Sequence, residues 1–454
     1  MNESWIYFTS FILLYLGTYS VQPITFLSVY FISRYSYLYP DNKISPSAAT
    51  FMEPIITLFC LFSILFSGIL DRLFGIRFTL IISSSIVIIT CVLYYFVEHF
   101  IMYVIGIGTI GVGIGLIGIA TKYMMFFFPG KEGTFAAIGR GVGYCFMYRW
   151  YYLAEYIINP ESIEQDKITK YYKDTVAENT KYYTLSIIFG TLISTVVFMV
   201  LTMGINFDEV KKKANEGKKE ELVEQENQEK YEKDLKTAFI SGKFWRLFVL
   251  CILLVFLPLL IASSNRVVGD KFGIKTEVIQ LNVSIAGFLG AGTTPIIGYL
   301  YDRYGMRKIY FPLAIALAGT GAIFILAIYY HSNVLFAISL YLNNMGCCSY
   351  NAVIFPYIGK IFSTNYVHEI YGVIGFTIGL VGFAGTGLQY LLVDILQLKE
   401  MLPYFICYGL GMGFDILTLL IIFFENEEPL EYEEKKNTVE NELYQEVTSS
   451  SDVN

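Results

Sequence analysis

The sequence predicts an all-α membrane protein with twelve transmembrane helices in two bundles of six. Of its residues, 55% are hydrophobic and 16% are charged, whereas a soluble globular chain carries roughly 25% charged residues. The apolar residues gather in twelve segments of about 20 residues or more, which is the length that crosses a bilayer core. A polar stretch separates six of these segments from the other six.

Each apolar segment is expected to be a helix, because a helix satisfies its own backbone hydrogen bonds in lipid. Two segments are rich in glycine, from Gly106 to Gly118 and from Gly372 to Gly387. These glycines either let helices pack closely or let them slide and bend against each other, and both interpretations are open. The expected spans are 5–32, 47–70, 77–97, 100–127, 132–158, 183–205, 243–263, 278–300, 309–330, 334–359, 368–393 and 401–424.

The polar stretch 206–242 contains blocks of lysine and glutamate and no apolar face of its own. It is therefore expected to be a solvated, partly helical linker rather than a folded domain. The expected domains are an N-terminal bundle 1–205, this linker, a C-terminal bundle 243–424 and a disordered acidic tail 425–454. The net charge of -7 comes largely from the linker and the tail.

The basic residues predict the orientation in the membrane. An even number of helices puts both termini, the linker and the loops at 71–77 and 302–308 on one side. That side collects most of the lysines and arginines, which predicts that it is cytosolic. The sequence does not distinguish the plasma membrane from an organelle membrane.

Residue patterns for catalysis and for cofactor binding are missing from the sequence. The seven cysteines lie in apolar segments without metal-ligand spacing and are expected to be free thiols. There is no phosphate-binding loop and no nucleophile with a neighbouring base. We therefore expect no enzyme activity, no cofactor, no metal and no nucleic-acid partner.

Two loops between apolar segments share a charged motif. They read Gly298-Tyr-Leu-Tyr-Asp302-Arg303-Tyr-Gly305-Met-Arg307-Lys308 and Asp71-Arg72-Leu-Phe-Gly75-Ile-Arg77. Both resemble the loop between the second and third helices in each half of a major facilitator superfamily transporter. The copy at 71–77 differs from the family pattern. It has one extra residue between Arg72 and Gly75, and Ser67 replaces the opening glycine.

This resemblance implies the major facilitator fold, which carries a small solute by alternating access. It also implies that Asp302 and Arg303 hold the cytosolic face of the second bundle closed in one state. Asp71 and Arg77 would do the same for the first bundle. A carboxylate at Asp302 would be stabilised by a nearby helix N-terminus or an arginine.

Two further stretches resemble the oxalate:formate antiporter-like and monocarboxylate porter-like branch of the superfamily. They are Phe126-Phe-Phe-Pro129-Gly-Lys131-Glu-Gly133 and the run from Asp234 to Phe248. High usage of Tyr, Ile, Lys and Asn is typical of an AT-rich genome and suggests an apicomplexan source. In that branch the eighth or eleventh helix generally carries a basic residue that meets the anion. Neither segment has one here, so a neutral or zwitterionic solute stays open.

Arg140 is the most informative charge inside a predicted span. It follows Lys131 by nine residues, which places it about 13 Å into the fifth helix. It binds a substrate carboxylate, pairs with an internal acid such as Glu155 or Asp415, or lines a hydrated cleft, and all three interpretations are open. The glycines around it are expected to leave space beside the guanidinium; they are Gly139, Gly141 and Gly143.

Other intramembrane polar residues complete the candidate site. Glu53, Glu155 and Asp415 are candidates for a coupling proton, because burial favours the protonated form of a carboxyl group. The candidate substrate contacts besides Arg140 are Tyr144, Gln22, Asn282, Asn343 and Asn351.

The leading hypothesis is a monomeric secondary-active transporter of a small polar organic solute. An organic anion such as a monocarboxylate is favoured, coupled to a proton or a counter-solute. One alternative is a carrier of an amino acid, a sugar or another neutral solute. The other is a receptor or scaffold on a transporter fold that moves no solute.

Overall fold

The structure is a computed structural model that describes residues 3–21, 30–31, 34–35, 51–96, 99–160, 174–216, 235–274, 276–362, 364–398 and 401–423. Its regular elements within these ranges are helices. They are α1 (Glu3–Thr18), η1 (Tyr19–Val21), α4 (Met52–Phe96), α5 (Phe100–Ile117), α6 (Ile119–Phe127), α7 (Glu132–Ile158), α8 (Asp174–Leu201), α9 (Phe207–Glu216), α11 (Gly242–Lys271), α12 (Thr276–Tyr304), α13 (Met306–Tyr329), α14 (Asn333–Ile361), η3 (Thr364–Tyr366), α15 (Val367–Tyr390), η4 (Leu391–Ile395) and α16 (Leu402–Phe423).

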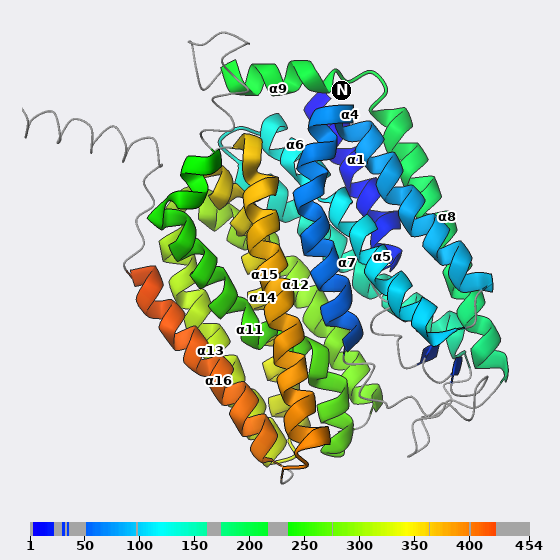
Figure 1. The fold of residues 1–454 in the computed structure, drawn as a ribbon, viewed down its shortest axis with the longest axis vertical. Coiled ribbons are helices and arrows are strands. Elements are labelled where there is room, and N and C mark those ends of the chain that lie inside the picture. The colour runs from blue at the N-terminus through cyan, green and yellow to red at the C-terminus, as the bar shows by residue number, and fades with distance from the viewer. Residues whose placement is uncertain are drawn as a thin grey trace, which may run out of the picture.

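Within the described ranges these helices form twelve long rods (Figure 1). Helix α4 supplies two of them, because Gly75 turns the chain with φ 79° and ψ 165°. Gly305 makes the equivalent turn between α12 and α13 with φ 79° and ψ 175°. A residue with a side chain rarely adopts this backbone conformation, so glycine is required at this position in both motif copies. Helices α5 and α6 meet at Gly118 and form one further rod.

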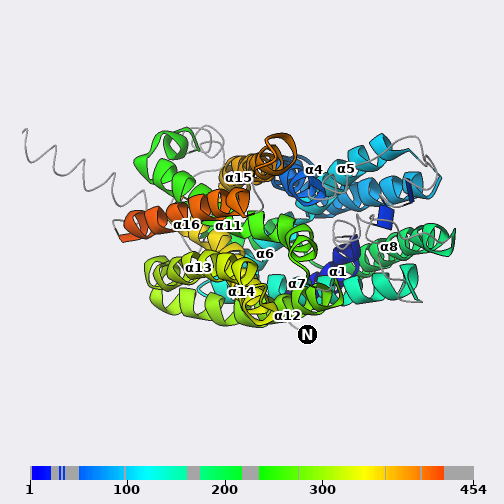
Figure 2. The same cartoon turned by 90° about the horizontal axis from the view of Figure 1, so that it is seen from below.

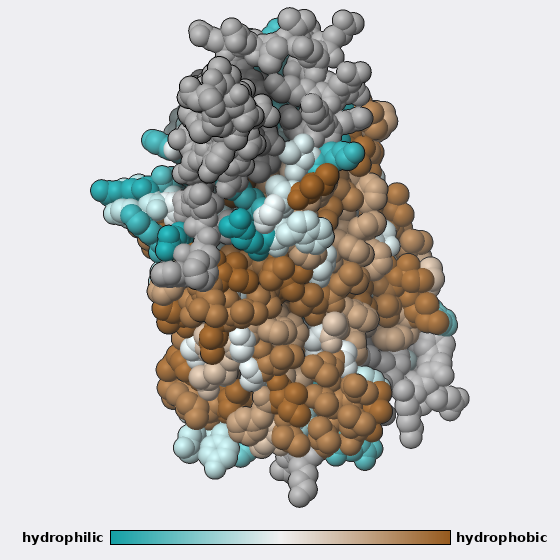
Figure 3. All heavy atoms as spheres, turned by 60° about the vertical axis from the view of Figure 1, so that its left-hand side comes forward, coloured by the Kyte–Doolittle hydropathy of each residue, from teal (hydrophilic) through white to brown (hydrophobic). Residues whose placement is uncertain are grey.

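The surface is that of a multi-pass membrane protein. Eight helices in the described part of the chain are long and apolar enough to cross a membrane, and α4 counts among them as a single helix. Figure 3 shows hydrophobic side chains covering most of one face, with hydrophilic residues gathered toward its upper and lower ends. Within the described residues the predicted spans correspond to these rods, and most rods extend a few residues beyond the apolar run at one end or both.

The rods form two groups that meet along two seams (Figure 2). We call helices α1 to α8 the N-half and helices α11 to α16 the C-half. Helix α4 packs against α15, and α7 packs against α12. The approach is closest at glycines: a Cβ atom added to Gly298 would lie 2.3 Å from the Cβ of Ala137. These seams allow no larger side chain at such positions without displacement of the helices.

Helix α9 lies across one end of the helices, which we call the linker end (Figure 1). Phe207 at its start is 8% exposed. The Phe207 ring packs at centroid distances of 5.8 Å from Tyr7 and 5.2 Å from Tyr123. The prediction that 206–242 has no apolar face is therefore wrong for this helix, because Phe207 and Val210 pack on the N-half.

Candidate transport site and gate

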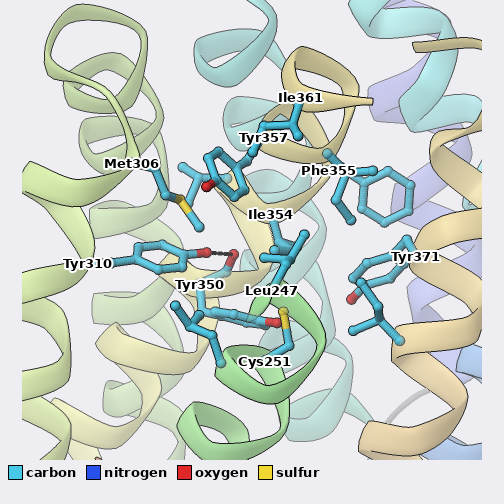
Figure 4. Packing of buried hydrophobic residues seen from close by; sticks show 14 of the residues in the cluster. Leu247, Cys251, Met306, Tyr310, Tyr350, Ile354, Phe355, Tyr357, Ile361 and Tyr371 are labelled. Carbon is cyan, nitrogen blue, oxygen red and sulfur yellow. Dashed lines mark hydrogen bonds between the residues drawn. The ribbon is translucent and has the colours of Figure 1, made fainter. Parts of the chain in front are cut away.

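Arg140 joins the two halves. Its guanidinium, on α7 of the N-half, donates a hydrogen bond to the backbone carbonyl oxygen of Asn351 in α14. The guanidinium carbon also lies 4.6 Å from the ring centroid of Phe355. Figure 4 shows Phe355 beside Tyr371, and their centroids are 4.3 Å apart. The Arg140 cation of the N-half therefore contacts a carbonyl oxygen and an aromatic face of the C-half.

Phenol groups surround this cation. The hydroxyls of Tyr371, Tyr144, Tyr15 and Tyr19 all lie within electrostatic range of the guanidinium. The rings of Tyr15 and Tyr19 stack at 4.9 Å, and Tyr19 meets Tyr144 edge to face at 6.3 Å. The surroundings of Arg140 thus combine one fixed positive charge with hydroxyl groups that donate and accept hydrogen bonds.

The glycines beside Arg140 serve helix packing rather than open space. A Cβ atom at Gly139 would lie 2.1 Å from the Phe11 ring, and one at Gly143 would lie 2.9 Å from Tyr15. At Gly141 it would lie 2.7 Å from the carbonyl oxygen of Ala291 on α12. The expectation of empty space is therefore wrong: α1 and α12 use these glycines to approach α7.

The predicted substrate contacts separate into two groups. Tyr144 and Asn351 lie with Arg140. Asn282 instead accepts a hydrogen bond of 2.6 Å from the Tyr341 hydroxyl, which ties α12 to α14. The Asn343 side chain donates to the carbonyl of Pro258 at 3.4 Å. Both asparagines hold C-half helices together. Gln22 lies outside the described residues.

Of the three predicted coupling acids, the structure describes the side chains of Glu53 and Asp415. Glu53 lies within electrostatic range of the Cys60 thiol, as Arg140 does. Asp415 is fully buried in α16, and its carboxylate oxygens have no hydrogen-bond partner among the described residues. Arg140 and Asp415 therefore do not pair. The side chain of Glu155 lies outside the described residues.

Asp302 closes the α7–α12 seam at the linker end. Its carboxylate accepts hydrogen bonds from the backbone N–H of Gly133 at 2.9 Å and of Thr134 at 2.7 Å. The Thr134 hydroxyl donates to it at 2.5 Å. A C-half carboxylate thus caps the N-terminus of an N-half helix, where orphan N–H groups and the helix dipole favour an anion.

The α4–α15 seam closes with a different contact. Arg72 on α4 forms a salt bridge of 2.9 Å with Glu369 in the first turn of α15. Asp71, 2% exposed, faces the interior of the N-half instead. It accepts a hydrogen bond of 2.8 Å from the Tyr123 hydroxyl and lies 3.1 Å from Lys211 Nζ on α9.

The other arginines of the motif serve their own halves. Arg77 donates to the carbonyl oxygens of Thr202, Met203 and Ile205, so it satisfies the C-terminal end of α8. Arg303 lies over the ring of its neighbour Tyr304 at 5.3 Å. Arg307 is exposed at the start of α13.

Several residues of the site were not predicted. Lys122 is a charge inside a predicted span, the same signal that identified Arg140. His368 and Glu369 stand at the start of a predicted span, where such residues are common. Of the aromatic residues around Arg140, Tyr144 was predicted; Phe355 and Tyr371 have no sequence signal, because buried tyrosine and phenylalanine are usually core residues.

Metal chemistry finds no support in the described ranges. No group of three His, Cys, Asp or Glu side chains there could hold a metal ion. The seven cysteines are free, which confirms the prediction for them.

The fold and the apolar helices of the described residues define a membrane protein of twelve rods in two bundles. Residues 180–386 match the sequence model of the Major Facilitator Superfamily. No curated protein matches the chain in sequence. The family match and the transporter fold indicate a transporter and not an enzyme.

Solved structures of the same fold are distant in sequence. A D-xylose–proton symporter is 14% identical with a TM-score of 0.64, covering 94% of this chain and 99% of its own. The xylose transporter XylE from E. coli, partially occluded and inward open, is 14% identical with a TM-score of 0.59, covering 92% and 97%. The human organic anion transporter MFSD10 is 10% identical with a TM-score of 0.60, covering 93% and 100%. These likenesses confirm the predicted fold; the predicted branch and apicomplexan source stay predictions.

Proposed function

We propose that the protein is a secondary-active transporter that moves a small organic anion, such as a monocarboxylate, by alternating access. The observation that carries the proposal is the bond from Arg140 to the Asn351 carbonyl oxygen. A carboxylate is a stronger acceptor for a guanidinium than a carbonyl, and it matches the two-pronged guanidinium geometry. An arriving anion would therefore replace the Asn351 carbonyl oxygen as the acceptor of this hydrogen bond.

The gate contacts support alternating access. Asp302 and the Arg72–Glu369 pair each join the halves at the linker end. We propose that this end faces the cytosol, because the basic loops gather there. Breaking both contacts would open the site to that side. A proton or a counter-solute would drive the cycle, with Glu53 as the first candidate for the proton.

A neutral solute is the second candidate function. The phenols around Arg140 suit the hydroxyl groups of a sugar, and a D-xylose–proton symporter shares the fold. Helices α12 and α15 also lack lysine and arginine along their apolar lengths.

Uptake by reconstituted protein separates these functions. Proteoliposomes would be given labelled monocarboxylates, pantothenate, neutral amino acids and D-xylose, with and without a pH gradient. We expect saturable uptake of at least one monocarboxylate. Uptake of D-xylose or amino acids alone would favour the neutral-solute carrier. Absence of flux for the whole panel from folded protein would favour the receptor or scaffold.

Arg140 substitutions test the anion site directly. Arg140→Ala and Arg140→Lys should each lower anion uptake by about 10- to 100-fold, because a hydrogen bond to a charged group is worth about 1.5–3 kcal/mol. Lysine does not rescue, since a point charge cannot replace the guanidinium fork. The control is Arg149→Ala, which removes an exposed arginine from the same helix. Unchanged uptake by Arg140→Ala, at equal amounts in the membrane, would remove Arg140 from the site.

A further inference from the structure

Two buried cations of the N-half have the same kind of partner, a backbone carbonyl oxygen of the C-half. Arg140 donates to the carbonyl of Asn351, and Lys122 Nζ donates to the carbonyl of Asn365 at 2.9 Å. Asn351 lies in α14, and Asn365 lies in η3, which follows it. A movement of the C-half away from the N-half therefore removes both acceptors together.

Part of the negative charge around Lys122 belongs to the C-half. It lies in α6 within the membrane span Phe100–Phe127 and is 3% exposed. The Asp71 carboxylate is 3.9 Å from Lys122 Nζ but only 3.1 Å from Lys211 Nζ. Asp71 is thus shared between two ammonium groups, and the second carboxylate that interacts electrostatically with Lys122, Glu369, belongs to the C-half. A buried charge is costly unless it is fully paired, so Lys122 requires a replacement acceptor once the Asn365 carbonyl leaves.

Phe355 and His368 lie between the two cations. The Phe355 ring carries the Arg140 guanidinium at 4.6 Å and meets the His368 ring edge to face at 5.2 Å. His368 is fully buried and interacts electrostatically with both Lys122 and Arg140. Lys122 is thus the next cation after Arg140 in the direction of the linker end, where its partners Asp71 and Asn365 lie.

We propose that Lys122 is a second anion-binding station, which receives the transported carboxylate from Arg140 on its way to the linker end. This rests on the proposed anion transport and states where the anion goes next. In the closed state the carbonyl oxygens of Asn351 and Asn365 lie where an oxygen of the transported carboxylate would bind, the first at Arg140 and the second at Lys122. When the halves separate, both N-half cations lose these acceptors and face the opened pathway, and the anion replaces first one and then the other.

Side-specific kinetics test the station. Labelled L-lactate would be presented to vesicles of both orientations, and the KM measured from each side. For Lys122→Gln we expect the KM on the linker side to rise about 10- to 100-fold, the effect of a lost hydrogen bond to a charged group. The KM on the opposite side should change less than about threefold, because the anion meets Arg140 first from there. Lys122→Arg should restore the linker-side KM to within about threefold of wild type.

Lys211→Gln is the matched variant, because it removes the same charge from the same Asp71 carboxylate at a position on α9, which is not one of the candidate membrane spans. It should leave the linker-side KM within about threefold of wild type. An equal rise from Lys211→Gln, or an equal rise on both sides from Lys122→Gln, would refute the station and leave anion transport standing. A wild type that carries none of the monocarboxylates would refute both.

Discussion

Asp302 and Arg72 occupy the same place in their two halves, three residues before a glycine with a φ of 79°. In the C-half this place holds a carboxylate that caps α7. In the N-half the same place holds the guanidinium of Arg72, and its acidic partner Glu369 lies on the facing helix α15. The extra residue between Arg72 and Gly75 explains the exchange: one position rotates a side chain by about 100° around a helix. Asp71 therefore turns away from the seam toward Tyr123 and Lys211.

Removing the Asp302 carboxylate should open the linker end. Asp302→Ala leaves two backbone N–H groups of α7 without their acceptor, and loss of a helix cap costs about 0.5–2 kcal/mol. The ratio of open to closed protein should rise by roughly 2- to 30-fold. The measurement is the labelling rate of Cys60 and Cys347 by an impermeant thiol reagent applied from the linker side.

Asp302→Asn serves as the graded control for this experiment, because its amide oxygen keeps one acceptor in place. Its labelling rates should fall between those of wild type and Asp302→Ala. Equal rates in all three proteins would mean that this carboxylate does not hold the linker end closed.

At the scale of elements, the seams depend on glycines that let two helices touch. At the α4–α15 seam, a Cβ atom on Gly372 would lie 2.7 Å from Leu65 Cα, and one on Gly379 would lie 2.6 Å from Leu58 Cα. Close packing, one of the two interpretations of the glycine-rich segments, therefore applies to this seam. Sliding and bending of these helices stays a prediction.

Gly298→Ala should therefore impair transport. The added methyl group would meet the Ala137 side chain and the Gly133 backbone, so α7 and α12 could no longer close. We expect uptake to fall at least about tenfold, because overpacking of a tight contact costs about 1–3 kcal/mol. Gly292→Ala on the same helix has open space around its Cβ and should stay within about twofold. Equal effects of the two substitutions would contradict the role of the seam.

Most elements could be predicted from the sequence, because twenty consecutive apolar residues have few structural alternatives in a membrane. The start of α7 at Glu132 follows from Pro129 and Gly130, which end the preceding helix. Helix α9 could not be predicted to pack on the N-half. Its apolar face consists of Phe207 and Val210, too few residues to give a clear helical period among so many charges.

At the scale of the whole molecule, the site depends on contacts between residues far apart in the sequence. Arg140 was predicted because a charge in an apolar segment is conspicuous. Its partners Asn351 and Phe355 lie more than 200 residues away, and no helical periodicity indicates which faces of two bundles meet. Asn282 and Asn343 were predicted to contact substrate but instead join helices of the C-half. The sequence does not separate these two roles, since polar side chains in a bundle also serve to join its own helices.

Cross-linking the halves should stop the cycle. A Cβ atom on Gly375 would lie 3.1 Å from the Leu61 Cβ, near the usual 3.5–4.5 Å of a disulfide. Oxidised Leu61→Cys/Gly375→Cys protein should lose at least about nine-tenths of its uptake, because alternating access requires the repeats to move against each other. Reduction should restore uptake to the level of the reduced double variant.

The control for this experiment is Leu259→Cys/Gly382→Cys, which joins α11 to α15 within the C-half. There a Cβ atom on Gly382 would lie 3.7 Å from the Leu259 Cβ. Its uptake should be insensitive to oxidation. Full uptake by the oxidised Leu61→Cys/Gly375→Cys protein would show that this seam stays closed throughout transport.

The carbonyl oxygens that accept from Arg140 and Lys122 have a consequence for natural variation in this chain. Every amino acid carries the same carbonyl, so exchanging the side chain at position 351 or 365 keeps the acceptor in place. A comparison of alleles would find these two positions permissive and the cations opposite them intolerant. Selection would act on one side of each of these two contacts only, so coevolution would leave no trace at them, in contrast to the Arg72–Glu369 pair, where two side chains join the halves.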